Sequence, residues 1–398
     1  MKKYKTLVTI IATFLVTSLM WVSVYNYMYA GDENLRKIET AYNIIKNNFV
    51  LDYDKNFVKD FTIAAMVESL RDKYSAFYPK EYYEQLSNGI EGHYYGIGVT
   101  VSADTKTGKL IVNDVQKDTP AGRAGIEAGD TILKVGDTPV NADNYQKAVD
   151  MIRGDENGEG TKVGLTLLRG TTENQYTVSV AREKIISSTV EGEMLENGIA
   201  YIKIKKFDNE TSNEFAQKLL DIGVDNVKYL ILDLRDNGGG TIYSTRLIAS
   251  MLLPKCVITQ FKYKNGSSTD IKTTGKQVLT APMCVLVNGG SASASEVLTS
   301  ALRDNKRAIV IGEQTFGKGI AQVTIPFETE NGKTVSALYL TYAHYLTPNG
   351  EDIHGKGLKP DIIVKTPEKY KNIEVSKWDR KEDTQFLKAM EKAKESIK

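Results

Sequence analysis

The feature that most constrains the fold is a series of short apolar runs in the second half of the chain. Residues 229–234 are apolar except for Asp233, and similar runs occupy residues 199–202, 285–287 and 309–311. A strand that is covered on both faces of its sheet is typically apolar along its whole length. Helical patterns at 211–220 and 247–252 alternate with these runs. Residues 184–365 are therefore predicted to form an α/β unit.

Two other patterns precede this unit. Between residues 32 and 88, apolar residues recur at the three- to four-residue spacing of helices. Between residues 92 and 182, glycines and β-branched residues predict short strands and turns, in a region the size of one small domain. The charged tail from residue 367 is expected to be helical. We expect five parts, with the limits 1–30, 31–91, 92–182, 183–366 and 367–398.

The first 30 residues predict an exported protein. Three lysines within the first five positions precede an uncharged stretch, residues 6–30. Such a stretch is long enough to cross a bilayer, and the lysines should stay in the cytoplasm. The alternative is a signal peptide cleaved after Ala30, although Met28 fits the small-residue cleavage rule poorly. We expect a single-pass membrane anchor with the catalytic part outside the cytoplasm, or a secreted protein if the segment is cleaved.

Composition argues against several classes of partner. The formal net charge is +1, which gives no reason to expect nucleic acid as a partner. With three histidines and no CxxC spacing, we expect no metal site. Cys256 and Cys284 lie in apolar runs, where buried free thiols are the simpler interpretation, although an exported protein could oxidise them.

A serine-rich turn follows the run 285–287. Asn288-Gly-Gly leads into Ser291-Ala-Ser-Ala-Ser-Glu296 and then into a helical pattern. Small residues at such a turn let a hydroxyl stand clear of the backbone, and the amides at a helix start can bind an anion. A nucleophilic serine and part of an oxyanion hole suit this position. Serines also cap helices, so the turn alone does not decide between the two.

Two further segments extend the pattern. Lys318 stands between glycines downstream of the run 309–311, without the spacing of a P-loop. A lysine can act as a general base if burial lowers its pKa, and Ser-Lys dyads are known variants of serine hydrolase sites. Three glycines, Gly238 to Gly240, follow the run 229–234. They could aim backbone N–H groups at a reacting carbonyl, or form a plain tight turn.

Together these segments resemble the carboxyl-terminal processing proteases (tail-specific proteases, peptidase family S41). The resemblance spans about residues 35–364 and implies a ClpP/crotonase-like α/β serine protease core. It implies that Ser293 is the nucleophile, that Lys318 is the base and that Gln322 orients the lysine.

The resemblance also implies an oxyanion hole at the backbone of Ala294 and of Gly238 or Gly239. One departure is visible, because many members of the family have proline where this chain has Gly238. The difference could loosen the hole but should not abolish it.

The middle region resembles a PDZ domain at Gly92–Val101 and Thr119–Ile126. Such a domain binds an extended peptide at its sheet edge and captures the terminal carboxylate with loop amides. The resemblance puts this loop at Tyr94, Tyr95, Gly96 and Ile97. Arg153 stands where the family often has a basic residue, and is either a peptide sensor or a solvated charge. The N- and C-terminal helices resemble dimer-forming elements of the family, so we expect a homodimer.

The sequence therefore predicts a serine endopeptidase without a cofactor, which cleaves exported proteins or peptides and recognises their free C-termini. One alternative is an exported PDZ-type adaptor with an inactive protease domain. Another is a crotonase-like acyl-CoA enzyme, which export disfavours because CoA substrates are cytoplasmic. His344 and His354 lie in segments that resemble structural elements of the family, so we do not expect them to be catalytic.

Overall fold

The structure is a computed structural model that divides into two compact units, residues 1–62 and 63–398. The residues it describes are 18, 20, 33–116, 118–154, 158–170, 174–186, 188–371 and 373–398. The first unit contains helix α2 (Glu33–Asn48) and the start of α3 (Lys55–Glu68). The predicted apolar stripe of α2 is exposed within this unit, with the side chains of Leu35, Ile38, Tyr42 and Ile45.

The predicted membrane anchor falls on residues 1–30, of which only 18 and 20 are described. In the described part of the chain, α2 is the longest helix, with 16 residues, and it carries charged side chains along its length. A membrane-spanning helix needs about 20 mostly apolar residues. No described helix is long and apolar enough to cross a bilayer, so the prediction of a single-pass anchor is corrected.

The middle region forms an antiparallel sheet with the strand order β3-β4-β5-β7-β8, to which β6 adds by pairing with β5. Its elements are β3 (Val99–Asp104), β4 (Lys109–Val115), α5 (Pro120–Arg123), β5 (Thr131–Val135), β6 (Thr138–Pro139), α6 (Tyr145–Ile152), β7 (Lys162–Leu168) and β8 (Gln175–Ala181). The alternating residues of β7 are buried because one face of the sheet covers an apolar core. The chain enters and leaves this region through a two-stranded ribbon of β2 (His93–Gly96) and β9 (Glu183–Ile186).

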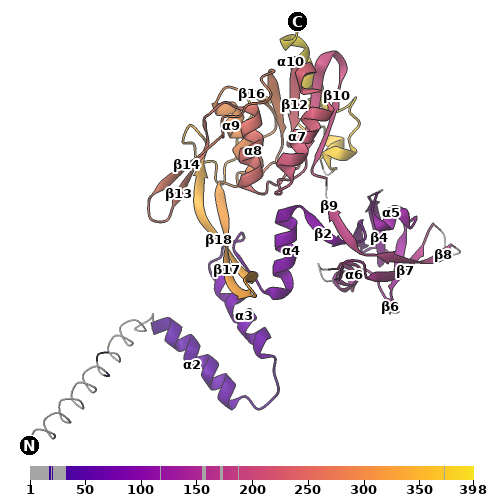
Figure 1. Cartoon of the computed structure of the whole chain (residues 1–398), viewed down its shortest axis with the longest axis vertical. Coiled ribbons are helices and arrows are strands. Elements are labelled where there is room, and N and C mark those ends of the chain that lie inside the picture. Colours follow the sequence, from indigo (N-terminus) through magenta and orange to yellow (C-terminus); the bar gives the residue numbers. More distant parts are fainter. Residues whose placement is uncertain are drawn as a thin grey trace, which may run out of the picture. The chain divides into compact units, whose positions relative to one another are not determined.

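The predicted α/β unit is built on a six-stranded sheet with the order β10-β11-β12-β15-β16-β19 (Figure 1). All neighbours are parallel except β10 and β11. The strands are β10 (Val190–Met194), β11 (Ile199–Ile204), β12 (Tyr229–Asp233), β15 (Met283–Val287), β16 (Ala308–Gly312) and β19 (Ile362–Ile363). The four apolar runs of the sequence are thus the four central strands.

Helices cover both faces of this sheet. The helices are α7 (Thr211–Asp221), α8 (Ile242–Leu252), α9 (Ala294–Asp304) and α10 (Thr384–Ser396). Leu230 and Leu232 of β12 belong to the larger core cluster, which includes residues of α7, α8 and α9. Ile231, between them, packs with residues of α10 on the other face. Both faces are therefore buried, which explains the continuous apolar runs. Cys284 on β15 is buried, and both cysteines are free thiols.

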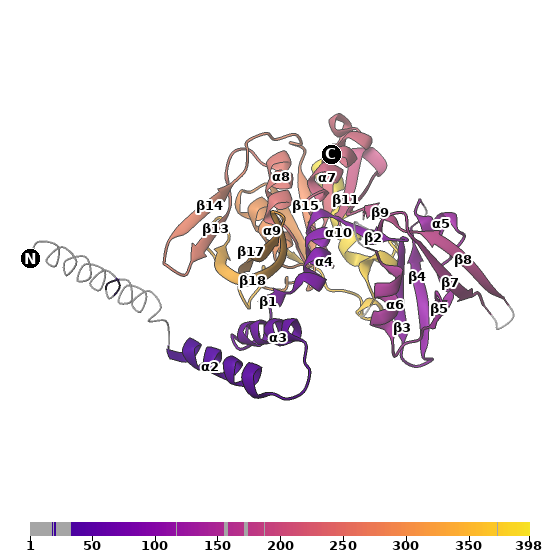
Figure 2. The same ribbon diagram turned by 60° about the horizontal axis from the view of Figure 1, so that its bottom comes forward.

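A second sheet has the order β1-β18-β13-β14, with β17 paired to β18 (Figure 2). Its strands are β1 (Ala76–Tyr78), β13 (Val257–Tyr263), β14 (Ser268–Lys272), β17 (Ile320–Glu330) and β18 (Lys333–Leu346). Strand β1 comes from the N-terminal region and pairs antiparallel with Ala337–Tyr339 of β18. Helix α4 (Lys80–Glu91) follows β1 and leads into the middle region. The N-terminal region is thereby attached to the sheet that carries the loop of Lys318.

A buried ion network connects the end of β12 to the C-terminal helix. The guanidinium of Arg235, which is 1% exposed, donates to both carboxylate oxygens of Asp233, with Nη2–Oδ2 at 2.6 Å. It also donates to Asp383, with Nη1–Oδ1 at 2.9 Å. The same Asp383 oxygen accepts the N–H groups of Gln385 and Phe386, which lie in the first turn of α10. One arginine therefore holds a strand end and a helix start together.

Replacing this arginine should destabilise the chain strongly. Arg235→Leu would leave two buried carboxylates without a cation, so we expect the free energy of unfolding to fall by about 3–5 kcal/mol. Urea denaturation followed by circular dichroism measures the change. As a matched control, Lys394→Leu removes a lysine that forms a partly exposed ion pair with Glu196 and should cost about 0–1 kcal/mol. Equal losses in the two variants would contradict this account of the network.

Candidate active site

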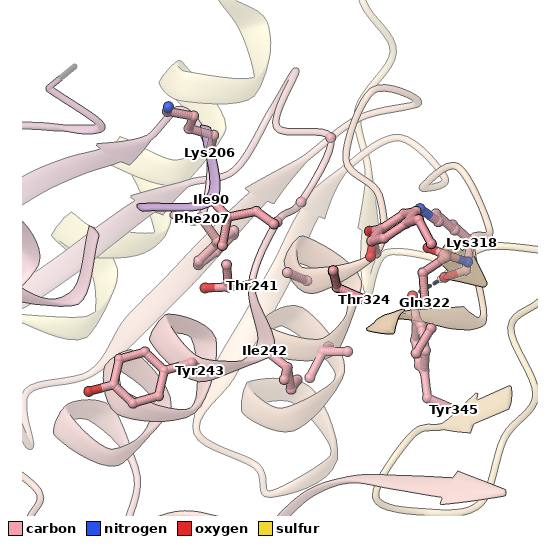
Figure 3. Close-up of a pocket in the computed structure, with 18 of the residues that line it drawn as sticks. Ile90, Lys206, Phe207, Thr241, Ile242, Tyr243, Lys318, Gln322, Thr324 and Tyr345 are labelled. Carbon is pink, nitrogen blue, oxygen red and sulfur yellow. Dashed lines mark hydrogen bonds between the residues drawn. The ribbon is translucent and has the colours of Figure 1, made fainter. Parts of the chain in front are cut away.

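Three loops meet at the carboxyl ends of the central strands and line one cavity of about 430 Å³ (Figure 3). The first follows β12 and contributes Gly238, Gly239 and Gly240; the second follows β15 and contributes Ser293 and Ala294. The third, after β16, contributes Lys318, and Gln322 follows on β17. Ligands of open α/β sheets bind at this edge because the loops of neighbouring parallel strands converge there.

Ser293 adopts a backbone conformation that residues other than glycine rarely take. Its φ is 55° and its ψ is −115°, immediately before α9 begins at Ala294. The neighbouring loop approaches so closely that a Cβ on Gly239 would lie 2.8 Å from the Cβ of Ser293. Backbone strain of this kind costs about 1–3 kcal/mol and is concentrated at functional sites. Ser293 is half-buried and lines the cavity.

Lys318 is half-buried and lines the same cavity. Burial lowers the pKa of its ammonium from the ordinary value, and the charge of Asp72 opposes part of that decrease. The preceding residue, Gly317, has a φ of +88°, and a Cβ there would lie 2.6 Å from the backbone nitrogen of Gly357. The glycine is therefore required by a close backbone approach. Burial in this loop therefore makes the amine of Lys318 easier to deprotonate than that of a lysine in water.

The carboxylate of Glu296 joins the serine loop to the lysine loop. Its Oε2 accepts the backbone N–H of Ser293 and that of Lys318, both at 2.9 Å. Its Oε1 accepts the N–H of Gly317 at 2.7 Å and the hydroxyl of Thr315 at 2.5 Å. Glu296 is fully buried, so all four bonds are shielded from water. In the sequence, Glu296 stands only as the last residue of the serine motif, and no role was predicted for it.

Gln322 lies beside Lys318 in the cavity, with Tyr345 nearby (Figure 3). The Nε2 of Gln322 donates to the hydroxyl of Thr341 on β18, at 3.0 Å. Tyr345, also on β18, is buried; its hydroxyl donates to the carbonyl of Lys318 and interacts with the side chain of Ser293. Burial and the nearby charge of Glu296 raise the pKa of Tyr345 well above its ordinary value. Tyr345 and Thr341 were not found from the sequence.

The glycine loop offers backbone donors beside Ser293. The N–H of Gly239 donates to the side-chain oxygen of Asn237 at 2.9 Å, inside the loop. Gly238 lines the cavity, and so does Ala294, the first residue of α9. The first N–H groups of a helix have no acceptor within the helix, so that of Ala294 can bind an anion. Both Ala292 and Ser295 donate to the carbonyl of Asn237, which fixes the two loops against each other.

The predicted peptide-binding residues lie together in the middle region. Tyr94, Tyr95, Gly96, Ile97 and Arg153 all line a narrow groove of about 60 Å³, formed with residues of β3 and α6. Strand β3 is at the edge of its sheet. The guanidinium of Arg153 donates to the side-chain oxygen of Gln85 on α4, at 2.6 Å. Arg153 is thus held by the helix that precedes the region.

Two of the histidines, His344 and His354, were predicted not to be catalytic. His344 and His354 are exposed, and their rings contact each other at a centroid distance of 5.8 Å. Neither of them lines the cavity that contains Ser293. Within the described residues, no group of three or more His, Cys, Asp and Glu side chains could hold a metal ion.

Comparison with known proteins identifies the class of protein that this fold and site define. Residues 198–364 match peptidase family S41, residues 111–160 match the PDZ domain, and residues 21–82 match the N-terminal domain of the activating protease CtpB. The chain belongs to peptidase family S41 and is a serine-type peptidase with a PDZ domain.

Its relatives include probable CtpA-like serine proteases of two staphylococci. The protein of Staphylococcus aureus (strain COL) is 35% identical over 387 residues, which are 94% of this chain and 75% of the relative. That of Staphylococcus haemolyticus (strain JCSC1435) is 33% identical over 366 residues, or 90% of this chain and 71% of the relative. The family resemblance predicted from the three motifs is confirmed.

Among the solved structures, one shows the same fold and another is similar in sequence. An S41 protease of Bacteroides fragilis, at 15% identity, has a TM-score of 0.51 and covers 83% of this chain and 90% of its own. The photosystem II D1 C-terminal processing protease is 26% identical, with a TM-score of 0.48, over 81% of this chain and 86% of its own.

The bonds of Glu296 predict a specific effect of its replacement. In Glu296→Gln, the amide NH₂ would face N–H groups that now donate to a carboxylate, and leaving buried donors unpaired costs about 1–3 kcal/mol each. We therefore expect the free energy of unfolding to fall by at least about 1–3 kcal/mol, measured by urea denaturation. Glu368→Gln, at an exposed position, is the matched control and should be neutral. If Glu296→Gln is equally neutral, the carboxylate does not hold the two loops.

Proposed function

We propose that the chain is a Ser-Lys endopeptidase in which Ser293 is the nucleophile, Lys318 the general base and Gln322 the residue that orients it. The observation that carries the proposal is that Ser293, Lys318 and Gln322 line one cavity at the carboxyl edge of the sheet. Burial lowers the pKa of Lys318, as a lysine base requires. The carboxylate of Glu296 holds the backbone of both loops in register.

In the proposed reaction, neutral Lys318 takes the proton of the Ser293 hydroxyl, and the oxygen attacks the scissile carbonyl. The N–H groups of Gly238 and Ala294 stabilise the oxyanion, an effect worth about 3 kcal/mol per donor. We favour Gly238 over Gly239 because the Gly239 N–H already donates to Asn237. Lys318 then gives the proton to the leaving amine, and water hydrolyses the acyl-enzyme.

Two substitutions test the catalytic assignment. Ser293→Ala should abolish cleavage because no nucleophile remains, and Lys318→Arg should do the same because arginine stays protonated at any working pH. Release of fluorescent fragments from labelled, denatured casein measures turnover. Ser267→Ala and Lys276→Arg, at exposed positions, are the matched controls and should cleave normally.

Normal cleavage by Ser293→Ala would reject the nucleophile, and an active Lys318→Arg would reject the base. A wild-type chain that binds peptides but never cleaves would favour the adaptor alternative.

We further propose that the PDZ domain recognises the free C-terminus of a protein substrate. Support comes from the groove beside the edge strand β3, which Tyr94 to Ile97 and Arg153 line. An extended peptide could add to this edge, with its carboxylate at the loop before β3. The apolar side chains of Val99, Val149 and Ile152 in the same groove suit an apolar tail.

Amidation of a peptide tail tests this recognition. A peptide ending in Val-Ala-Ala should bind the Ser293→Ala chain about tenfold more tightly with a free carboxylate than with an amide, because hydrogen bonds to a charged group contribute about 1.5–3 kcal/mol. Isothermal titration calorimetry measures both affinities. Acetylation of the other end of the peptide is the control and should leave binding unchanged. Equal affinity of the acid and the amide would refute carboxylate capture.

Exposed apolar side chains in the first unit support the proposal of a homodimer. Along α2 and the segment after it, Leu35, Ile38, Tyr42, Ile45 and Phe49 are exposed within that unit. An amphipathic helix normally buries such a stripe against another surface. A second copy of the chain would provide one.

A further inference from the structure

The segment between α3 and β1 lies against the proposed base, although it is far from it in the sequence. The Nζ of Lys318 lies 4.6 Å from the centre of the Tyr74 ring, within the distance at which a cation interacts with an aromatic face. The charge of Asp72, two residues earlier, also acts on Lys318. Both residues lie within the match to the N-terminal domain, residues 21–82, and outside the peptidase match.

Asp72 is fixed by hydrogen bonds to the strand that orients Gln322. Its Oδ2 accepts the hydroxyl of Ser75 at 2.7 Å, and its Oδ1 accepts the N–H of Tyr74 at 3.1 Å. The side chain of Thr341 also bonds to Asp72, and its backbone N–H donates to the Ser75 hydroxyl at 3.0 Å. Because Thr341 accepts from Gln322, one network links Asp72 to the residue beside the base.

Strand pairing determines the position of this segment. Ala76 pairs with Tyr339, and Tyr78 with Ala337, so β1 continues the sheet directly after Ser75. The rings of Tyr78 and Tyr339 contact each other at 6.1 Å, and those of Phe77 and Phe327 at 5.6 Å. The segment is therefore held by a paired strand rather than by its own few hydrogen bonds.

We propose that Asp72 and Tyr74 are positioning residues for Lys318, through which the N-terminal region controls the proton state and the direction of the base. The inference rests on the proposed function, since it takes Lys318 as the base. An aromatic face and a carboxylate both favour the charged amine. They oppose the effect of burial and keep Nζ beside the Tyr74 ring, so the amine has to lose a proton and reach Ser293 to act as the base.

Charged and titratable groups of several elements lie around Lys318, near its side chain or its backbone. Asp72, Tyr74 and Lys73 come from the segment itself, and the Nζ of Lys73 lies 5.0 Å from the same Tyr74 ring. Glu296 of α9 binds the backbone of Lys318, and Tyr345 of β18 donates to its carbonyl. Asp72 raises the pKa of Lys318 and burial lowers it. Removing the Asp72 charge should therefore lower the pKa of Lys318.

The pH dependence of kcat/KM tests the proposal. The acid limb of this profile reports the ionisation of the base in the free enzyme. In Asp72→Asn the limb should move to lower pH by about one unit, because a nearby opposite charge typically shifts a pKa by about 1–3 units and this site is partly open to solvent. The assay uses the full chain and fluorescein-labelled casein. A change in stability alone would lower kcat/KM by the same factor at every pH and would not move the acid limb.

Two further variants, Tyr74→Leu and Asp225→Asn, make the outcome decisive. Tyr74→Leu removes the aromatic face but keeps apolar volume, so its limb should move in the same direction even if Asp72→Asn folds poorly. Asp225→Asn removes an exposed carboxylate that precedes β12, at the opposite edge of the sheet, and should leave the limb in place. Limbs that stay at the wild-type pH in both Asp72→Asn and Tyr74→Leu would overturn the proposal.

Ser293→Ala and Lys318→Arg are measured in parallel. If Ser293→Ala and Lys318→Arg are both inactive while the acid limbs of Asp72→Asn and Tyr74→Leu are unmoved, only the positioning role fails. If either one cleaves, the proposed function itself fails.

Discussion

The site depends on one buried carboxylate. Glu296 is in the first turn of α9, where a negative charge is favourable because helix N-terminal amides point toward it. Its two oxygens accept N–H groups from both the serine loop and the lysine loop. Two other contacts join the same loops, namely the backbone N–H of Phe316, which donates to Ser291, and the hydroxyl of Tyr345. Glu296 differs from them because it binds the backbone of Ser293 and of Lys318 directly, and so contributes to the relative position of the two residues.

A second buried charge cluster lies at the end of β12, immediately before the glycine loop. Arg235 holds the end of β12 to Asp383 at the start of α10. The next residue, Asp236, accepts the N–H of Val375 and the side-chain amide of Asn288, which begins the serine turn. The C-terminal tail therefore contacts the glycine loop through Asp236, which in turn bonds to Asn288 at the start of the serine turn. Truncating the tail would remove these contacts and uncover one face of the sheet.

The N-terminal region contacts the site through the second sheet. Because β1 pairs with β18, the same strand that carries Thr341 and Tyr345 also binds the segment of Asp72 and Tyr74. The residues around the amine of Lys318 thus come from the N-terminal region, α9 and β18. A displacement of β1 would change the surroundings of the amine directly, which gives the region a role beyond attachment.

The sequence by itself determined the α/β class, the strand runs, the family and the three segments that line the cavity. Each of these is a local pattern. Apolar runs indicate strands buried on both faces, and glycines indicate places where two backbones approach closely. Only the tertiary structure showed that Glu296 joins two loops, that Tyr345 and Thr341 contact the site, and that Asp72 and Tyr74 lie beside Lys318. Such contacts join residues that are far apart in the sequence. They arise from the register in which two strands pair, and a single sequence contains no signal for that register. For the first 30 residues, hydropathy predicted a membrane anchor, whereas the described helices include none that could span a bilayer.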